Sequence, residues 1–123
     1  MQVQIDHIHL RSSDCLAAAR FFFEMSAPTE TGRIGAPVSR VMLDLAGLTL
    51  FIEQAPQLPA GATPPHRGLE HIGLRVADIE AAVAALARAG FPLVSGVTEL
   101  NPALRIAFLD GPDGVRIELL QRG

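Results

Sequence analysis

Hydrophobic and polar residues alternate along two segments of the chain, 5–10 and 69–76. Side chains two positions apart in a strand point to the same face, so this period predicts a β-strand with one buried face in each segment. Short apolar stretches separated by Gly, Pro and Asp predict further strands. These include residues 38–45, 48–53, 104–109 and 115–121.

A helix is expected after each of the first two strands. Asp14 and Asp78 stand at the predicted helix starts, where a carboxylate can accept hydrogen bonds from the free amides of the first turn. Gly90 can end the second helix in the left-handed conformation. The apolar stripe of that helix consists of Ile79, Ala82, Val83 and Leu86. The pattern therefore predicts the order βαβββ, twice.

The sequence of the first half recurs in the second. Residues 7–19 and 71–83 are identical at seven of thirteen positions, at a constant offset of 64 (71 − 7). The ends of the halves, 43–54 and 109–121, correspond after one inserted residue. A repeat pairs each position with a partner and so defines the architecture. We expect one α+β domain over residues 1–123, with module one at 3–56, a Pro- and Gly-rich linker at 57–67 and module two at 68–121.

Three residues fall on the strand face that the apolar residues do not occupy. His7 and His71 are partners in the repeat, and Glu118 alternates with Ile117 and Leu119 in the last strand. Two sheets with helices on their outer faces are expected to curl into a cup lined by these three residues. Two imidazoles and a carboxylate, with positions left for substrate, are typical of an open divalent-metal site.

Other residues share this face by strand parity. His9 lies two residues from His7 and is a candidate acid, base or substrate contact, because histidine titrates near neutral pH. Phe51 and Glu53 lie on the same face of the strand that ends module one. Parity also places four residues of the preceding strands in the pocket: Arg40, Met42, Arg105 and Ala107. Either arginine could bind a carboxylate or phosphate of a ligand.

Composition narrows the classes of partner. With 49% hydrophobic residues among 123, the chain can bury a core. The net charge of −3 comes from interspersed acids and bases, which does not favour nucleic acid as a partner. No apolar stretch approaches the roughly 20 residues of a membrane span. The N-terminus lacks the features of a secretory signal and Cys15 is the single cysteine, so we expect a cytoplasmic protein.

The motifs at these positions resemble the vicinal-oxygen-chelate (VOC) superfamily, which includes glyoxalase I, methylmalonyl-CoA epimerase, fosfomycin-modifying enzymes, extradiol dioxygenases and bleomycin-binding resistance proteins. Residues 5–8, 68–78 and 110–121 carry the resemblance, which spans nearly the whole chain. It implies a small-molecule substrate or ligand and a homodimer. It also implies one divalent ion per site, Zn, Mn, Fe, Ni or Co, held by His7, His71 and Glu118.

Phe51 departs from one branch of this superfamily. In members with four ligands, such as glyoxalase, the last strand of the first module supplies a Glu or Gln, and the repeat places Phe51 there. Glu53 could supply that ligand, or act as a base, after a shift of one residue pair, about 6–7 Å along the strand. His7, His71 and Glu118 instead resemble the three ligands of the fosfomycin enzymes and the extradiol dioxygenases. We find no convincing counterpart of the fosfomycin enzymes' substrate- and potassium-binding residues.

Three functions are open at this point. The first is a metalloenzyme of lyase, isomerase or epimerase type, in which the ion chelates vicinal oxygens of a small substrate. The second is an Fe(II) dioxygenase of the extradiol type, because two histidines and a carboxylate leave positions open for substrate and dioxygen. The third is a metal-free binding or resistance protein, in which Phe51 and an apolar pocket hold a small molecule.

Overall fold

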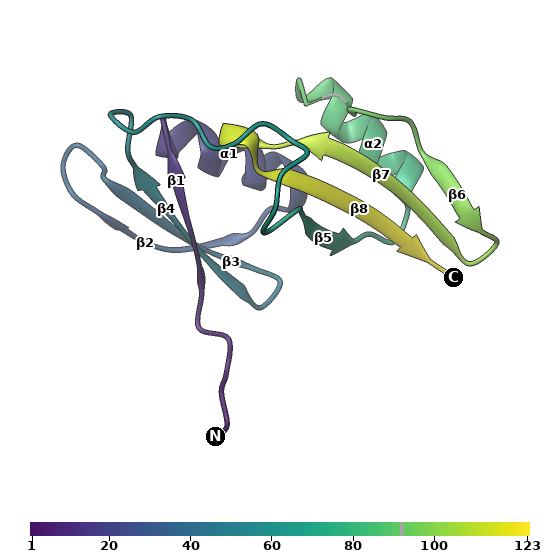
Figure 1. The fold of residues 1–123 in the computed structure, drawn as a ribbon, viewed down its shortest axis with the longest axis horizontal. Coiled ribbons are helices and arrows are strands. Elements are labelled where there is room, and N and C mark those ends of the chain that lie inside the picture. Colours follow the sequence, from purple (N-terminus) through teal and green to yellow (C-terminus); the bar gives the residue numbers. More distant parts are fainter. Residues whose placement is uncertain (92) are drawn as a thin grey trace. The chain divides into compact units, whose positions relative to one another are not determined.

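Two compact units, Met1–Pro59 and Ala60–Gly123, make up the chain in the computed structural model, which describes residues 1–91 and 93–123. Each unit has its own sheet and its own helix (Figure 1). No helix among the described residues is long and apolar enough to cross a membrane.

The first unit is a four-stranded sheet with one helix. Its strands are ordered β1-β4-β3-β2, with β1 parallel to β4 and the other neighbours antiparallel. The elements are β1 (Ile8–Ser12), α1 (Cys15–Ser26), β2 (Thr29–Ile34), β3 (Arg40–Leu45) and β4 (Leu48–Gln54).

The second unit repeats this topology. Its strands are ordered β5-β8-β7-β6, and β5 is parallel to β8. The elements are β5 (Ile72–Arg75), α2 (Ile79–Arg88), β6 (Thr98–Asn101), β7 (Leu104–Asp110) and β8 (Arg116–Arg122), with a short 3-10 turn, Pro112–Gly114, between the last two strands. The α+β class and the twice-repeated βαβββ order predicted from the sequence are confirmed.

Both helices begin at the predicted caps. Asp14 accepts a hydrogen bond from the Ala17 amide at 3.1 Å, and Asp78 accepts one from the Ala81 amide at 3.1 Å. Each carboxylate thus satisfies one of the amide groups that a helix start leaves without an intrahelical partner. Gly90 follows α2 with a φ of +93°, the left-handed conformation expected at that end.

A glutamine at the end of each sheet binds the start of the helix in the same unit. The Cys15 amide donates to Gln54 Oε1 at 2.7 Å, and the Ile79 amide donates to Gln121 Oε1 at 2.8 Å. Gln54 and Gln121 are partners in the repeat (121 − 54 = 67). The repeat therefore preserves a link between helix and sheet as well as the strand order.

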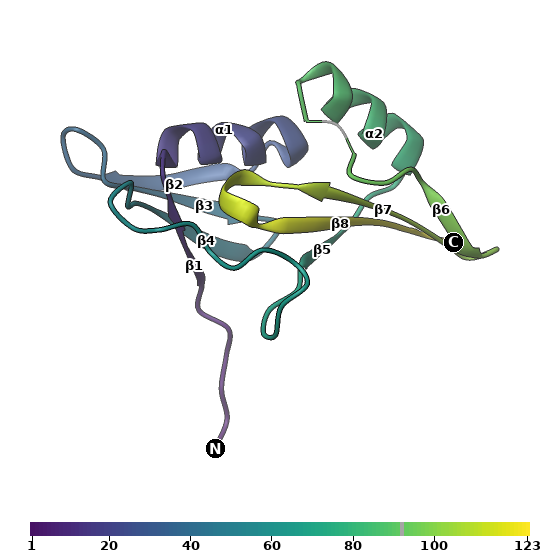
Figure 2. The same ribbon diagram turned by 45° about the horizontal axis from the view of Figure 1, so that its top comes forward.

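Each helix packs on one face of its own sheet (Figure 2). Helix α1 contacts β1, β3 and β4, and α2 contacts β7 and β8. The side chains between helix and sheet are almost fully buried. Among them are Phe22, Leu43, Leu50 and Ile52 in the first unit, and Ile79, Leu109, Ile117 and Leu119 in the second. Burial of these apolar side chains fixes which face of each strand is left for polar residues.

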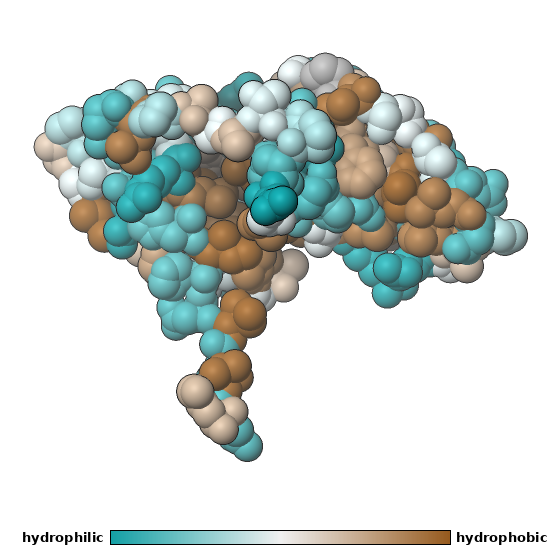
Figure 3. Space-filling view, in the orientation of Figure 1, coloured by the Kyte–Doolittle hydropathy of each residue, from teal (hydrophilic) through white to brown (hydrophobic). Residues whose placement is uncertain are grey.

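The first strand begins later than its alternating pattern predicts. The ladder between β1 and β4 starts at Ile8, which pairs with Leu50. Residues 1–6 continue away from the sheet, and their apolar side chains Met1, Val3 and Ile5 are exposed (Figures 1 and 3). Alternation alone predicted a strand from residue 5, but among the described residues no strand pairs with this segment.

Candidate metal and ligand site

The two sheets align position by position at the candidate site. In the first unit His9 pairs with Phe51 across the parallel ladder of β1 and β4. In the second unit Gly73 pairs with Glu118 across the parallel ladder of β5 and β8. His9 and Gly73 are partners in the repeat (73 − 9 = 64), so Phe51 occupies in module one the position of Glu118 in module two. The strand registers confirm the equivalence predicted from the sequence.

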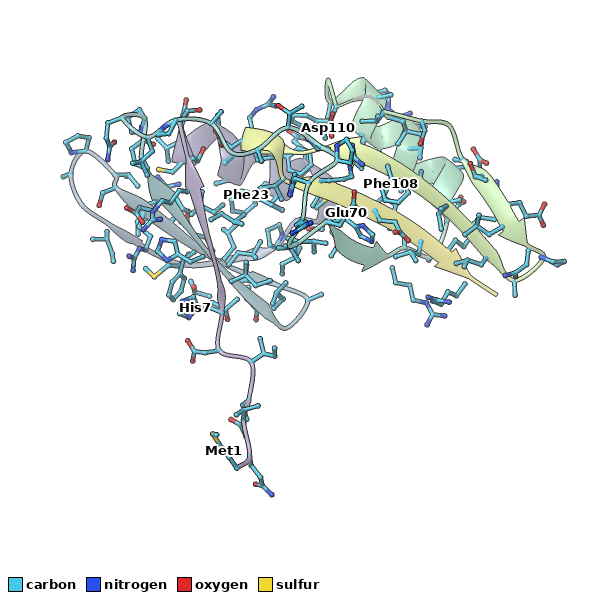
Figure 4. The ribbon with its side chains drawn as sticks, in the orientation of Figure 1. Met1, His7, Phe23, Glu70, Phe108 and Asp110 are labelled. Carbon is cyan, nitrogen blue, oxygen red and sulfur yellow. The ribbon has the colours of Figure 1, made fainter. Side chains whose placement is uncertain are left out.

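In the second unit His71 and Glu118 meet on the face of the sheet away from α2. The imidazole Nε2 lies 2.8 Å from Glu118 Oε2, and the two side chains are 33% and 12% exposed. The ring of Phe108 on β7, which is labelled in Figure 4, contacts the imidazole edge to face, with the ring centroids 5.3 Å apart. A histidine directly before β5 and a partly buried carboxylate on β8 therefore direct their polar atoms to one point.

The other nitrogen of His71 is also engaged. Its Nδ1 is hydrogen-bonded to the carboxylate of Glu70, the preceding residue. Arg116 on β8 donates to the other oxygen of that carboxylate at 3.1 Å, and its Nε lies 3.8 Å from Asp110. The hydrogen bond from His71 is the main cause of a lowered pKa for Glu70. The charge of Arg116 lowers this pKa further, while partial desolvation opposes the shift.

In the first unit His7 lies directly before β1, where the N-terminal segment enters the sheet (Figure 4). Its Nδ1 is 2.6 Å from Asp6 Oδ2, so the ring can offer Nε2 to an ion. The imidazole also stacks on Phe51, with centroids 4.2 Å apart and an interplanar angle of 22°. The two histidines thus share an arrangement in which the preceding acidic residue holds Nδ1.

His9 and Glu53 form a pair on the same face of the first sheet. His9 Nε2 lies 2.7 Å from Glu53 Oε1, and Arg11 Nε donates to the same oxygen at 3.3 Å. The hydrogen bond from His9 is the first cause of a lowered pKa for Glu53; Arg11 adds to it, and desolvation opposes it. Both partners bind the same carboxylate oxygen, Oε1, and the contact with His9 fixes one nitrogen of that imidazole. A role of Glu53 as a fourth metal ligand stays a prediction.

A shallow pocket of about 240 Å³ lies beside this pair in the first unit. Its lining is Ile34, Ser39, Arg40, Glu53 and Gln54. The guanidinium carbon of Arg40 lies 5.3 Å from the centroid of the Phe51 ring, within the range of a cation–π contact. Met42 pairs with Phe51 in the ladder of β3 and β4. Both Arg40 and Met42 therefore lie on the face that parity predicted.

The same expectation is wrong for Arg105 and Ala107. Ala107 is fully buried in the core, and Arg105, on the same face of β7, binds Glu80 of α2. The reason is that the offset between β3 and β7 is not the offset of 64 that relates the first strands of the two modules. Leu43 and Leu109 are partners at an offset of 66 (109 − 43), which makes Phe108 the counterpart of Met42.

Phe108 is the residue that parity missed. It pairs with Glu118 across β7 and β8, as Met42 pairs with Phe51 across β3 and β4. The sequence contained this signal, because the alignment of Leu43-Asp44 with Leu109-Asp110 already identifies Phe108 as the counterpart of Met42.

The three expected metal ligands are divided between the units, His7 in the first and His71 with Glu118 in the second. Over residues 1–91 and 93–123, no three His, Cys, Asp or Glu side chains gather into a group that could hold an ion. The imidazole and carboxylate of the second unit are nevertheless groups that bind a divalent ion. Ligand atoms about 2 Å from a tetrahedral ion lie roughly 3.3 Å apart, so the 2.8 Å between His71 Nε2 and Glu118 Oε2 need only open slightly.

Comparison with known proteins places the chain in a family. The sequence profile of the Glyoxalase/Bleomycin resistance protein/Dioxygenase superfamily matches residues 4–119. The chain therefore belongs to this superfamily, as its motifs predicted. A search of the curated proteins found no match.

Solved structures share the fold over almost their full length. A glyoxalase family protein from Enterococcus faecalis is 24% identical, with 95% of this chain and 96% of that chain covered and a TM-score of 0.79. The fosfomycin resistance protein FosX from Listeria monocytogenes is 16% identical, with 100% and 96% covered and a TM-score of 0.80. A variant of FosX with Mn(II) and 1S,2S-dihydroxypropylphosphonic acid is 16% identical, with 97% and 90% covered and a TM-score of 0.74.

Proposed function

We propose that this protein is a metal-dependent enzyme of the superfamily, in which His7, His71 and Glu118 hold one divalent ion that chelates vicinal oxygens of a small substrate. The reaction class is that of a lyase, isomerase or epimerase. The observation that carries the proposal is the pairing of His71 Nε2 with Glu118 Oε2 at 2.8 Å, on a face of the sheet that the helix of the unit does not cover. The Mn(II) complex of the FosX variant, a structure of the same fold, supports it.

The bound ion supplies Lewis-acid stabilisation of negative charge that develops on substrate oxygens. The protein residues around it bind and orient. Phe51, in place of a fourth ligand, gives the first unit an apolar surface beside His7, and Arg40 lies over that ring. An acidic group of the substrate would find its partner in Arg40.

The His9–Glu53 pair supplies the candidate for proton transfer. Glu53 holds Nε2 of His9, which leaves Nδ1 as the atom that exchanges a proton with substrate. The ring centroids of His9 and His7 are 6.3 Å apart, so the candidate base lies near one of the proposed ligands. Glu53 acts here through His9, as a residue that orients the imidazole.

Metal content tests the proposal. Protein purified without chelator should contain about one divalent ion per chain, measured by inductively coupled plasma mass spectrometry. His71→Ala should lose this ion. His66→Ala provides the matched control, because His66 is exposed and lies outside both sheets, and it should retain the ion. A wild-type protein that is purified without metal and takes up no divalent ion would exclude the proposal.

A second candidate is a metal-free binding protein, and the stack of His7 on Phe51 favours it. The Phe51 ring, which stands where a metal ligand is expected, can hold a planar or apolar molecule. Arg40 would bind an acidic group of that molecule. Binding of a small aromatic acid such as benzoate to chelator-treated protein, weakened by Phe51→Ala and unaffected by added metal, is the result expected of this alternative. If the protein is instead a metal-dependent enzyme, added metal should strengthen the binding of such a molecule.

A further inference from the structure

We propose that Glu70 is a positioning residue that fixes the imidazole of His71 for metal binding, and that Arg116 acts by holding Glu70 in place. This inference rests on the proposed role of His71 as a metal ligand. It assigns a function to two residues, Glu70 and Arg116, that lie outside the proposed set of ligands.

The two ring nitrogens of His71 have different partners. A histidine that binds a metal through one ring nitrogen usually donates the other N–H to a carboxylate or carbonyl, which fixes the ring orientation and raises its basicity. His71 has this arrangement, because its Nδ1 is bonded to Glu70 while its Nε2 faces Glu118. Glu70 therefore determines which nitrogen is presented to an ion beside Glu118.

Glu70 is itself held. Arg116 NH1 donates to Glu70 Oε1 at 3.1 Å, which leaves Oε2 for His71. Arg116 pairs with Asp110 in the ladder of β7 and β8, and its side chain is only 27% exposed. Its Nε is buried and forms no hydrogen bond with any described residue, so the polar contacts of the guanidinium come from Glu70 and the more distant Asp110. The network runs from Arg116 on β8 through Glu70 to the imidazole.

Module one provides an internal comparison. Asp6 contacts His7 Nδ1 at 2.6 Å, as Glu70 contacts His71, but the Asp6 side chain is 90% exposed and that of Glu70 is 54% exposed. Because Phe51 and Glu118 are equivalent at an offset of 67 (118 − 51), the counterpart of Arg116 is Thr49, which carries no charge. Among the residues that the structure describes, no cation contacts Asp6 as Arg116 contacts Glu70. Glu70 should therefore contribute more to metal affinity than Asp6 does.

Metal affinity of the full chain tests this. Mn(II) and Zn(II) dissociation constants would be measured by competition with a chelating dye for wild type, Glu70→Leu, Glu70→Gln and Asp6→Leu. Glu70→Leu should weaken binding about 10- to 100-fold, the usual effect of losing such a partner. Glu70→Gln keeps an acceptor and should lose less, and Asp6→Leu should also lose less than Glu70→Leu. The melting temperature of the metal-free protein should be nearly the same in all four, because these side chains are exposed.

A double-mutant cycle separates the role of Arg116. Arg116→Gln should weaken metal binding in the wild-type background and have little further effect in the Glu70→Leu background, because it acts through Glu70. Additive effects would overturn that claim. If wild type binds metal and Glu70→Leu binds it equally well, the inference is wrong while the proposed metal site stands. If wild type binds neither ion, both fall.

Discussion

Phe51 occupies in module one the place that Glu118 occupies in module two. The registers of the two parallel ladders establish this, since His9 pairs with Phe51 and its repeat partner Gly73 pairs with Glu118. An aromatic ring and a carboxylate at equivalent positions make the two halves chemically different although their backbones repeat. In the proposed metal site, this one difference leaves three protein ligands in place of four.

A carboxylate in place of Phe51 should restore a fourth ligand. Phe51→Glu presents an oxygen at the position equivalent to Glu118, beside His7, whose ring is 4.2 Å from that of Phe51. An added anionic ligand should tighten divalent-metal binding by at least about tenfold, or roughly 1.4 kcal/mol. Competition with a chelating dye measures the change.

Phe51→Leu is the control for this substitution, because it removes the ring without adding a donor. We expect its metal affinity to stay within about threefold of wild type, a difference of less than 1 kcal/mol. If Phe51→Glu bound metal no more tightly than Phe51→Leu, the equivalence would hold for the backbone alone and the site would not lie beside Phe51.

The glutamines that bind the helix starts should stabilise both units. Gln121→Leu removes the acceptor for the Ile79 amide, and Gln54→Leu removes that for the Cys15 amide. Gln121→Leu should lower the free energy of unfolding by about 1 kcal/mol, the typical contribution of one hydrogen bond. Gln54→Leu should lower it by at least as much, because Gln54 Nε2 also donates to the Ser13 carbonyl at 3.2 Å. Urea denaturation checks this, with Gln57→Leu on the exposed linker as a control that should be neutral. Equal stabilities for all three variants would contradict this role.

The contribution of Glu53 to stability should depend on pH. Its pKa is lowered in the folded protein by the hydrogen bond from His9 and by Arg11, so the folded state favours the ionised carboxylate. This stabilisation is fully present above about pH 5, where the carboxyl is ionised in both states, and is lost as the pH falls through its folded pKa. The difference in unfolding free energy between wild type and Glu53→Gln should therefore shrink from about pH 6 towards about pH 3. A difference that grew on acidification would show that the sign is wrong.

The repeat made most of the fold predictable from the sequence. The caps Asp14 and Asp78, the βαβββ order and the equivalence of Phe51 with Glu118 all follow from local patterns that occur twice. The prediction failed where two strands were compared by parity alone. Parity groups Arg105 with Arg40 on the pocket face. The register instead makes Phe108 the counterpart of Met42, so Phe108 is the residue of β7 on that face.

The contact between Glu70 and His71 could not be predicted from strand alternation, for a structural reason. Neighbouring side chains in a regular strand point to opposite faces, so alternation separates Glu70 from His71. The ladder of β5, however, begins only at Ile72, and before it the chain brings the two side chains together. The sequence signal was an acidic residue directly before each repeated histidine, Asp6 before His7 and Glu70 before His71. Only the positions of the side chains show that each of these carboxylates contacts Nδ1 of the histidine that follows it.

In the proposed site, His7 and His71, one from each module, bind the same ion. X-ray absorption at the metal edge counts imidazole ligands directly, and metal-saturated wild type should show two imidazoles on its ion. Both His7→Ala and His71→Ala, saturated with the same metal, should show one. If His7→Ala retained the imidazole count of wild type, His7 would not be a ligand, and the shared three-ligand site would be contradicted.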